Sequence, residues 1–366
     1  MTIISVRNRF PTSRPRATIA DVAAAAGVSK ATVSKFFGGK EYYVAAGTRQ
    51  RIADAVRELD FQPNAIAQGL SRQRSDTIGV VVASVANPFY PELIAGIEDV
   101  IGASEYTLLL GSSDGQAGRE ARIVRSMMQR QVDGVIMASV TMQDGEVARL
   151  AESGLSVVLA SRNLSRSLVD TVMVDNVGGA RMAVAHLLEH GHRRIAHISG
   201  PQDVVPFRSR LTGFVEELRD HGVAVDADLI VPSLTTAAAG AVAAERLLDL
   251  PERPTAVFVA NDSMALGVLE ACARRGVRIP EDLAVVGFDG IWVGGLPGVR
   301  LTTVDSKARE VGRSAAHLLA ARIDARRSAG AGETSPETRV LRPELVVRRS
   351  CGCGAPDAPA GSGAGP

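Results

Sequence analysis

Residues 18–37 read TIADVAAAAGVSKATVSKFF and carry the signals of two short helices joined by a tight turn. Thr18 followed by Asp21 predicts a capping box at the start of the first helix, because each side chain can bond the other residue's backbone amide. Gly27 can adopt the positive φ that ends a helix, and Ser29 offers a hydroxyl that caps the next one. Two short helices joined through such a turn form a helix-turn-helix, whose second helix enters the major groove of DNA.

The second helix of this pair has an inner and an outer face. Val33, Phe36 and Phe37 fall on one side and are expected to pack inward. The opposite side carries small, polar and cationic side chains that can meet base edges and phosphates. We expect the DNA contacts of this part of the chain to come from Thr18, Ser29, Lys30, Ala31, Thr32, Ser34, Lys35 and, in a third helix, Thr48.

The residue types in this stretch are more specific than their spacing. The chain resembles the LacI family of bacterial transcription regulators at Thr18, Ile19, Asp21, Val22, Ala23, Ala26, Gly27, Val28, Ser29, Thr32, Val33 and Ser34. Later motifs match others of the family in order, at residues 87–90, 132–136, 174–176, 190–196, 253–258, 261–267, 279–283, 286–289 and 301–304. The resemblance runs from about residue 18 to 350 and implies a helix-turn-helix followed by a two-lobed core like that of periplasmic binding proteins.

Charge is distributed unevenly along the chain. The formal net charge is +1, but the first 74 residues contain twelve Lys or Arg and five Asp or Glu, so they carry +7 and the rest carries −6. A basic segment at one end of a mildly acidic chain indicates a polyanionic partner for that segment. Residues 1–16, with arginine and proline but no periodicity, are predicted to be a flexible basic arm.

A third helix is expected over residues 44–60, followed by a linker over 63–76. Where the family usually caps this third helix with Ser or Thr, the chain has Ala45, which removes about 1 kcal/mol of capping. The linker resembles the family's hinge. The hinge segment that starts at Pro63 has about eight residues and is too short to be helical alone, because isolated helices need roughly 12 to 15 residues. The resemblance implies that Asn64, Ala67 and Leu70 contact DNA and that Leu70 is a wedge in the minor groove.

From residue 77 onward, short apolar runs alternate with amphipathic helices, which predicts an α/β fold of doubly wound parallel sheets. Strands are expected at 78–83, 107–110, 134–138 and 156–160, and in a second set at 195–198, 229–231, 256–260 and 283–288. The predicted division is a helix-turn-helix domain over 17–62, an effector-binding and dimerisation core over 77–350 and a disordered tail over 351–366. Within the core, the N-lobe takes 77–174 and 305–335, and the C-lobe takes 175–304 and 336–350.

Ligands bind such sheets at the carboxyl ends of their strands. The resemblance implies that Arg210 and Asp289 bind a small effector between the lobes and that Phe89 and Tyr90 stack on it. A polyol needs charged partners and an aromatic face of this kind. The remaining candidates are Arg162, Phe207, Asn261 and Trp292. Phe89 and Tyr90 also suit a packing role, and Ser161 and Gly290 replace residues frequent in the family, so effector identity does not transfer.

Cysteine and histidine patterns indicate no metal site and no cofactor. Cys272 lies in an apolar helix and is expected in the core, while Cys351 and Cys353 fall in the predicted tail. His190 and His192 belong to a turn motif between a helix and a strand. No secretion signal or membrane span is present in the sequence, which favours a cytoplasmic protein.

These observations predict a transcription regulator that is not an enzyme, and most simply a repressor of a carbohydrate-use operon. Its expected partners are double-stranded operator DNA of near-palindromic sequence, a sugar-like effector and a second copy of the chain, with dimer or tetramer left open. Three alternatives remain: a plain sugar-binding module, an enzyme using the region between the lobes, and a global regulator controlled by a phosphoprotein. A helix-turn-helix argues against the first, and the absence of a nucleophile or cofactor motif argues against the second.

Overall fold

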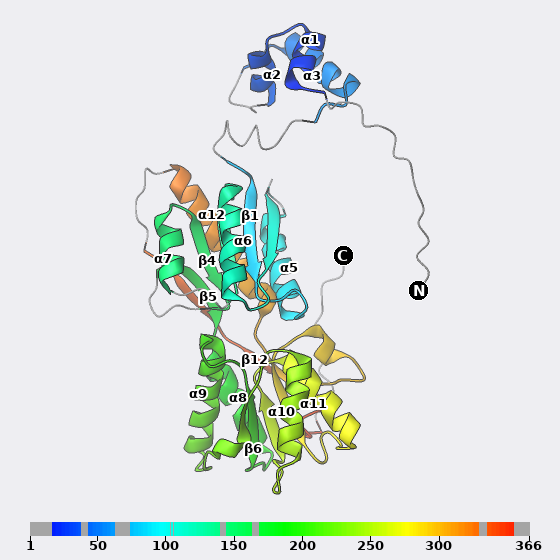
Figure 1. The fold of residues 1–366 in the computed structure, drawn as a ribbon, viewed down its shortest axis with the longest axis vertical. Helices are drawn as coiled ribbons and strands as arrows, with labels where there is room; N and C mark the ends of the chain where they lie inside the picture. The colour runs from blue at the N-terminus through cyan, green and yellow to red at the C-terminus, as the bar shows by residue number, and fades with distance from the viewer. Residues whose placement is uncertain are drawn as a thin grey trace, which may run out of the picture. The chain divides into compact units, whose positions relative to one another are not determined.

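A computed structural model describes residues 17–37, 43–62, 74–102, 104, 106–139, 144–162, 168–328 and 335–354. These residues divide into two compact units, one ending at Ser75 and the other beginning at Asp76. The first unit contains α1 (Ile19–Ala26), α2 (Lys30–Phe37) and α3 (Ala46–Glu58). The second contains two sheets with helices on both faces, as Figure 1 shows.

The caps predicted for the first unit are confirmed. The backbone amide of Thr18 donates to Oδ2 of Asp21 at 2.8 Å, and the Asp21 amide returns a bond to the Thr18 hydroxyl. Gly27 has a φ of 64°, and the Ser29 hydroxyl accepts the Thr32 amide at 3.1 Å. Short helices like these depend on their caps and on packing, because their own propagation is marginal.

The three helices enclose one small hydrophobic core. Val22, Val33 and Ile52 are fully buried in it, one from each helix, and Phe36 and Phe37 pack at its edge. The expected inner face of α2 is therefore confirmed. The third helix begins at residue 46 with Ala45 as its N-cap, and no side chain supplies a capping bond there.

The first sheet of the second unit has the order β11-β5-β4-β3-β1-β2, and every described pairing in it is parallel. Its strands are β1 (Thr77–Val82), β2 (Thr107–Ser112), β3 (Gly134–Ala138), β4 (Ser156–Ala160), β5 (Asp170–Val174) and β11 (Thr338–Leu341). One face is covered by α5 (Phe89–Ile101) and α12 (Ala308–Ser328), and the other by α6 (Ala117–Gln129) and α7 (Asp144–Glu152). We call this sheet with its helices the first lobe.

The second sheet has the order β12-β10-β9-β8-β6-β7, with only the β10–β12 pairing antiparallel among those described. Its strands are β6 (Ile195–Ser199), β7 (Ile230–Pro232), β8 (Ala256–Val259), β9 (Ala284–Asp289), β10 (Thr302–Asp305) and β12 (Glu344–Val346). One face is covered by α8 (Asn176–Glu189) and α9 (Val205–Asp220), and the other by α10 (Ala237–Leu248) and α11 (Asp262–Arg275). Short 3₁₀ helices, η1 (Ala227–Leu229) and η2 (Trp292–Gly295), complete this second lobe.

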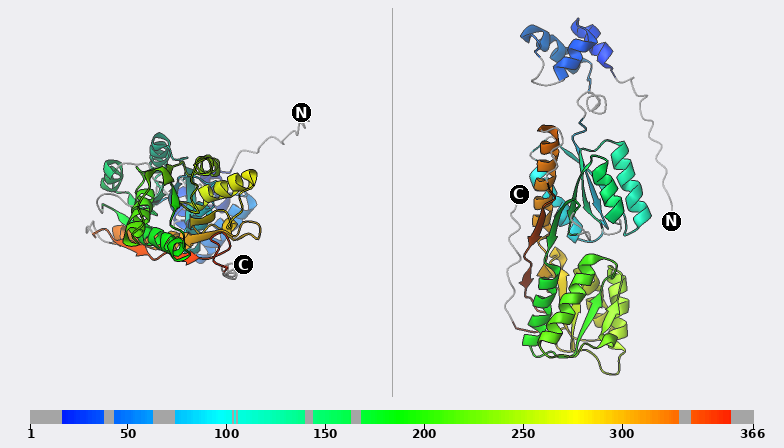
Figure 2. Two further views of the ribbon diagram at one scale, coloured as in Figure 1. Left: turned by 90° about the horizontal axis from the view of Figure 1, so that it is seen from below. Right: turned by 90° about the vertical axis from the view of Figure 1, so that its left-hand side faces the viewer.

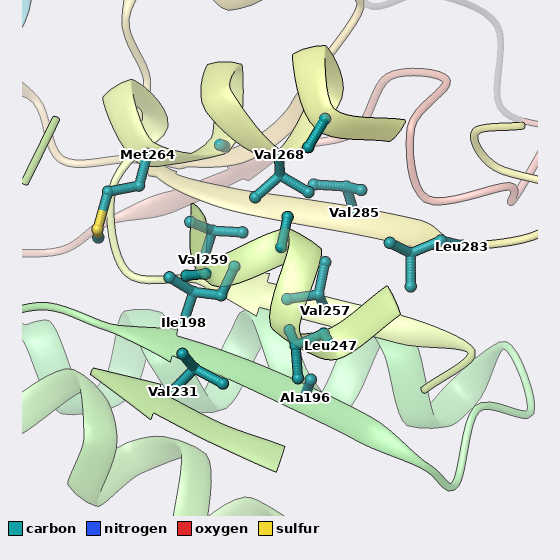
Figure 3. Packing of buried hydrophobic residues seen from close by; sticks show 14 of the residues in the cluster. Ala196, Ile198, Val231, Leu247, Val257, Val259, Met264, Val268, Leu283 and Val285 are labelled. Carbon is teal, nitrogen blue, oxygen red and sulfur yellow. The ribbon is translucent and has the colours of Figure 1, made fainter. Parts of the chain in front are cut away.

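Apolar strands and small helix residues explain the tight layers of both lobes. Figure 3 shows Ile198, Val257 and Val285 of the second sheet against Leu247 and Val268 of its covering helices. In the first lobe, α5 and α12 touch through their backbones: a Cβ added at Gly96 would lie 1.9 Å from the carbonyl oxygen of Arg309. Glycine is required at that contact because no larger residue fits.

The chain passes between the lobes three times, at Asp175, at Ser306–Lys307 and at Arg342–Pro343. The last crossing joins two short edge strands of different sheets: β11 belongs to the first sheet and β12 to the second. Figure 2 shows both strands at the left of its right-hand view. The predicted division placed residues 336–350 in the C-lobe, and this boundary was wrong for Thr338–Leu341, because β11 pairs with β5 of the first lobe.

The C-terminal cysteines also differ from expectation. Cys351 is buried in the core of the second lobe, where its thiol accepts the Thr302 hydroxyl at 3.2 Å, and Cys353 packs beside it. The predicted tail therefore does not begin at residue 351. Cys272 lies in the core on α11, as predicted. None of the helices described in the structure is both long and apolar enough to cross a membrane.

Candidate functional site

A buried arginine lies among the carboxyl ends of strands in the second sheet. Arg210, on α9, donates from Nε to Oδ1 of Asn176 at 2.9 Å and from Nη1 to the carbonyl oxygen of Ala260 at 2.5 Å. The same Nη1 is 3.4 Å from Oδ1 of Asp289, the last residue of β9. Two elements of the sheet and the first residue of α8 thus fix this guanidinium, and the structure brings Arg210 and Asp289 together.

The surroundings of this pair are aromatic and largely dry. The guanidinium carbon of Arg210 lies 3.7 Å from the centroid of the Phe288 ring and 5.3 Å from that of Phe207. Arg210 is 6% exposed and Asp289 is 7% exposed. Burial raises the pKa of Asp289 to about 6, although the neighbouring Arg210 opposes the rise. Charged groups held in a poorly hydrated place interact strongly with an entering polar ligand.

A second carboxylate, which the sequence analysis did not single out, organises the loop after β9. Asp262 is fully buried at the start of α11 and accepts the amides of Gly290 and Ile291, each at 2.9 Å, and the Thr303 hydroxyl at 2.7 Å. Burial and the charge of Asp289 raise the pKa of Asp262 to about 8, and its three donors oppose that rise. Asp262 therefore positions the segment that carries Asp289 and the residues after it.

The first lobe has its own polar cluster at the carboxyl ends of its strands. Arg162 follows β4, is 6% exposed, and donates to the carbonyl oxygen of Ser139, which follows β3. Its Nη1 is 3.6 Å from Oε1 of Glu120 on α6. The hydroxyl of Ser139 is buried and has no hydrogen-bond partner among the described residues, and the same holds for Ser199 at the end of β6. Buried hydroxyls in that state are available to a polar ligand.

Phe89 and Tyr90 begin α5 and meet edge to face, with ring centroids 5.2 Å apart. Phe89 is buried in the core of the first lobe, which favours the packing role for it. Tyr90 is half-buried. Burial raises the pKa of its phenol well above the ordinary value, the charge of Asp289 adds to the rise, and that of Arg210 opposes it. Tyr90 is therefore the predicted aromatic whose phenol is influenced by the charges of Asp289 and Arg210 in the second lobe.

Three remaining candidates occupy different surroundings. Phe207 packs on Gly200, where a Cβ would lie 2.4 Å from its ring, and it also lies beside Arg210. Asn261 is buried and caps α11, because its Oδ1 accepts the Met264 amide at 2.8 Å. Trp292 is 61% exposed on η2. The structure thus gathers Phe207 with the buried arginine, gives Asn261 a helix-capping bond, and leaves Trp292 largely in solvent.

In the first unit, most of the residues predicted to contact DNA are exposed on the surface of the helix-turn-helix. Thr18, Ser29, Lys30, Ala31, Ser34 and Lys35 are exposed, and Thr32 and Thr48 are half-buried. Arg49, which was not among the predicted contacts, extends over the Phe36 ring at 5.5 Å from the centroid and is itself exposed. The remaining three predictions, Asn64, Ala67 and Leu70, lie outside the described residues.

Two family descriptions match the chain. Residues 18–64 match the family described as bacterial regulatory proteins, lacI family. Residues 184–351 match the periplasmic binding protein-like domain. The first range contains the helix-turn-helix, and the second contains Arg210, Asp262 and Asp289.

Three similar proteins cover most of the chain. The HTH-type transcriptional repressor CytR of Escherichia coli (strain K12) is 35% identical over 334 residues, which are 91% of this chain and 96% of that protein. The structure of the transcriptional regulator CelR–cellobiose complex has a TM-score of 0.68 at 33% identity and covers 92% of this chain and 100% of that one. The lac repressor dimer bound to operator and the anti-inducer ONPF has a TM-score of 0.79 at 26% identity, covering 92% and 99%.

Proposed function

This chain belongs to the LacI family of bacterial regulatory proteins, and from that premise we propose that it represses a carbohydrate-use operon and releases the operator in response to a sugar-like effector. It is a sequence-specific DNA-binding transcription regulator with an effector-binding core. The observation that carries the proposal is the buried Arg210–Asp289 pair at the strand ends of the second lobe. The charge of Asp289 raises the pKa of Tyr90 in the first lobe and that of Arg210 lowers it, which supports a place for Tyr90 near this pair.

The chemistry of these groups suits a polyhydroxylated ligand. A guanidinium and a carboxylate can each bond two neighbouring hydroxyl groups, and a phenol ring covers the apolar side of a sugar. The first lobe would add Arg162, Glu120 and the buried hydroxyl of Ser139 from the opposite side. The complex of a relative with cellobiose supports a sugar as the effector class.

In the proposed mechanism, two chains bind the two half-sites of a near-palindromic operator. The solved structure of the lac repressor, a dimer bound to operator, supports a dimer as the binding unit. The effector binds both polar clusters and favours one arrangement of the lobes. That arrangement alters the dimer and separates the hinges. The hinges then withdraw Leu70, the proposed wedge, from the minor groove. To convert a mostly bound population into a mostly free one, the effector must prefer the released state by about 5 kcal/mol.

We also propose that the protein acts in the cytoplasm, where operator DNA is found, and that it is not an enzyme. Of the alternatives, a plain binding module would not need the helix-turn-helix of the first unit. A regulator controlled by a phosphoprotein remains the second candidate, and it differs in one measurable respect: small molecules would leave its DNA affinity unchanged.

A thermal-shift screen of the full chain against sugars, polyols and nucleosides identifies the effector class, because a ligand that binds the native state raises the melting temperature. Operator affinity is then measured by fluorescence anisotropy with and without the hit. Arg210→Ala should keep operator binding and lose the response to the effector. Arg208→Ala, an exposed arginine on the same helix, is the matched control and should respond like the wild type. A fully responsive Arg210→Ala protein would remove this arginine from the effector site.

A further inference from the structure

Three side chains to which neither proposed binding site gives a role meet at the end of α8. Potential metal-ligand atoms of His186, His190 and Cys353 all lie within 4.8 Å of one another. The Sγ atom of Cys351 is 3.3 Å from that of Cys353. Two imidazoles and one thiol, far apart in sequence, are thus brought to one place in the second lobe, and a second thiol lies beside the first.

The hydrogen bond of His190 sets its tautomer. Its Nδ1 lies 2.7 Å from the carbonyl oxygen of His186. A carbonyl oxygen can only accept, so Nδ1 carries the hydrogen and Nε2 keeps its lone pair. Metal-binding histidines are oriented in this way, with one ring nitrogen bonded to a backbone carbonyl and the other directed at the ion.

His186 provides an independent indication of a ligand. His186 is only 9% exposed, and its Nε2 atom is buried without a hydrogen-bond partner among the described residues. Its ring lies 4.5 Å from that of His190, centroid to centroid, so this unpartnered nitrogen belongs to the same cluster. A buried polar atom left unsatisfied in a folded protein calls for a partner, and a cation would supply it.

The thiols are held there by contacts that do not depend on any ion. The Ser350 hydroxyl donates to the carbonyl oxygen of Val285 at 2.6 Å and accepts the Thr302 amide at 2.8 Å, which fixes the segment against two strands. Cys351 then enters the core, and Cys353 follows at the rim beside α8. The ligands would therefore be largely positioned before binding, which lowers the entropic cost of assembling a site.

We propose that His186, His190 and Cys353 bind one Zn²⁺ ion, with the fourth position of the tetrahedron left to a water molecule. Imidazole and thiolate donors in a tetrahedral set are those that zinc favours among the divalent cations. The ion would tie the last turn of α8 to the C-terminal segment. Asn176, which holds Arg210, is ten residues before His186 on the same helix, about 15 Å away at 1.5 Å per residue. The site is therefore separate from the proposed effector site and does not rest on the proposed function.

The test uses the full chain without an affinity tag, kept reduced and stripped of metal with a chelator. Zn²⁺ is titrated against a chromophoric chelator, and Co²⁺ binding is followed through the thiolate charge-transfer and visible bands that tetrahedral thiolate coordination produces. The wild type should bind one ion per chain. Cys353→Ser and His190→Ala should each weaken Zn²⁺ binding by about 100-fold or more, since even the loss of an outer-shell partner costs 10- to 100-fold.

His221→Ala is the matched control. His221 follows the end of α9 as His190 follows the end of α8, and its Nδ1 lies 3.0 Å from the carbonyl oxygen of Glu217. It removes the same kind of helix-end contact away from the cluster and should bind Zn²⁺ like the wild type. Circular dichroism of the metal-free proteins establishes that all four are folded. Absence of Zn²⁺ binding in the wild type, or equal affinity in the wild type and Cys353→Ser, would overturn the proposal.

Discussion

Asp262 of the second lobe accepts the backbone amide of Ile291 at 2.9 Å, and the side chain of Ile291 is buried in the hydrophobic cluster of the first lobe. One carboxylate thus fixes a residue that belongs, through its side chain, to the other lobe. The same carboxylate bonds the Gly290 amide next to Asp289, a proposed effector ligand. A change in how Asp289 is engaged can therefore reach the contact between the lobes through two backbone amides.

Replacing Asp262 tests this connection. Asp262→Ala leaves two amides and the Thr303 hydroxyl without their buried acceptor, which should lower the free energy of unfolding by about 3 kcal/mol. It should also reduce the effect of the effector on operator affinity while leaving operator affinity without effector nearly unchanged. Asp262→Asn keeps one acceptor oxygen and the side-chain volume, so a smaller loss is expected. Urea unfolding measures the free energy, and anisotropy titrations measure the operator affinity. An Asp262→Ala protein whose operator affinity responds to the effector as in the wild type would contradict the role of Asp262 in linking the effector site to the contact between the lobes.

The buried His197 should make the folded protein less stable in acid. Its ring is stacked between Phe214 and Phe258, and burial lowers its pKa to about 4. In the unfolded chain the pKa of His197 is near 6.5, so between pH 6.5 and 4 the unfolded chain binds more protons than the folded protein. The contribution of the neutral ring to the free energy of unfolding, fully present above pH 6.5, is therefore lost as the pH falls toward 4. The slope should reach about 1.4 kcal/mol per pH unit. His197→Phe removes this titration. Urea unfolding of both proteins at pH 7, 6 and 5 measures the contribution of His197 as the difference between their free energies of unfolding. Equal pH slopes of this free energy in the two proteins would contradict the prediction.

The uncapped start of α3 can be repaired. Ala45 is exposed and has the extended ψ of an N-cap, but it has no oxygen to accept the free amides. Ala45→Ser should stabilise the helix-turn-helix by about 1 kcal/mol, or about fivefold in the opening equilibrium. Hydrogen exchange of the α3 amides measures this directly. Ala46→Ser, one position inside the helix, is the control and should give no such protection because serine has lower helix propensity than alanine.

The hinge prediction concerns a residue outside the described part of the chain. Leu70→Ala should weaken binding to the specific operator by about tenfold or more, equal to about 1.4 kcal/mol, because the wedge contacts with an unstacked base step are lost. Binding to unrelated DNA depends mainly on phosphate charges and should remain nearly unchanged. Anisotropy titrations at one fixed salt concentration compare the two, and equal losses on both DNAs would show that Leu70 is not a wedge.

Local signals in the sequence were enough for the helix-turn-helix and for most strands. The Thr18–Asp21 box and the Gly27 turn involve residues three or a few positions apart, so their chemistry is readable from the chain. The strands β5, β10, β11 and β12 were not predicted. The last three have four residues or fewer, and β11 and β12 pair with partners far away in sequence.

In the polar sites, too, some residues could be predicted from the sequence, while their contacts could not. Arg210 and Asp289 were found through family motifs, but the contacts of Arg210 with Asn176 and Ala260 arise only where α8, α9 and the end of β8 meet. Glu120 occupies an ordinary position of an amphipathic helix, and nothing in its neighbourhood marks it as buried. The approach of Cys353 to the end of α8 was missed for the same reason, since a three-dimensional contact brings these residues together.

The three crossings of the chain between the lobes determine when the protein can be completed during synthesis. Both sheets receive an edge strand from residues 338–346, so a ribosome must translate past residue 338 before either sheet can close. The helix-turn-helix needs only early residues and can form first. A nascent chain therefore acquires its DNA-reading surface well before the body that controls it, and the two lobes reach their final form together rather than one after the other.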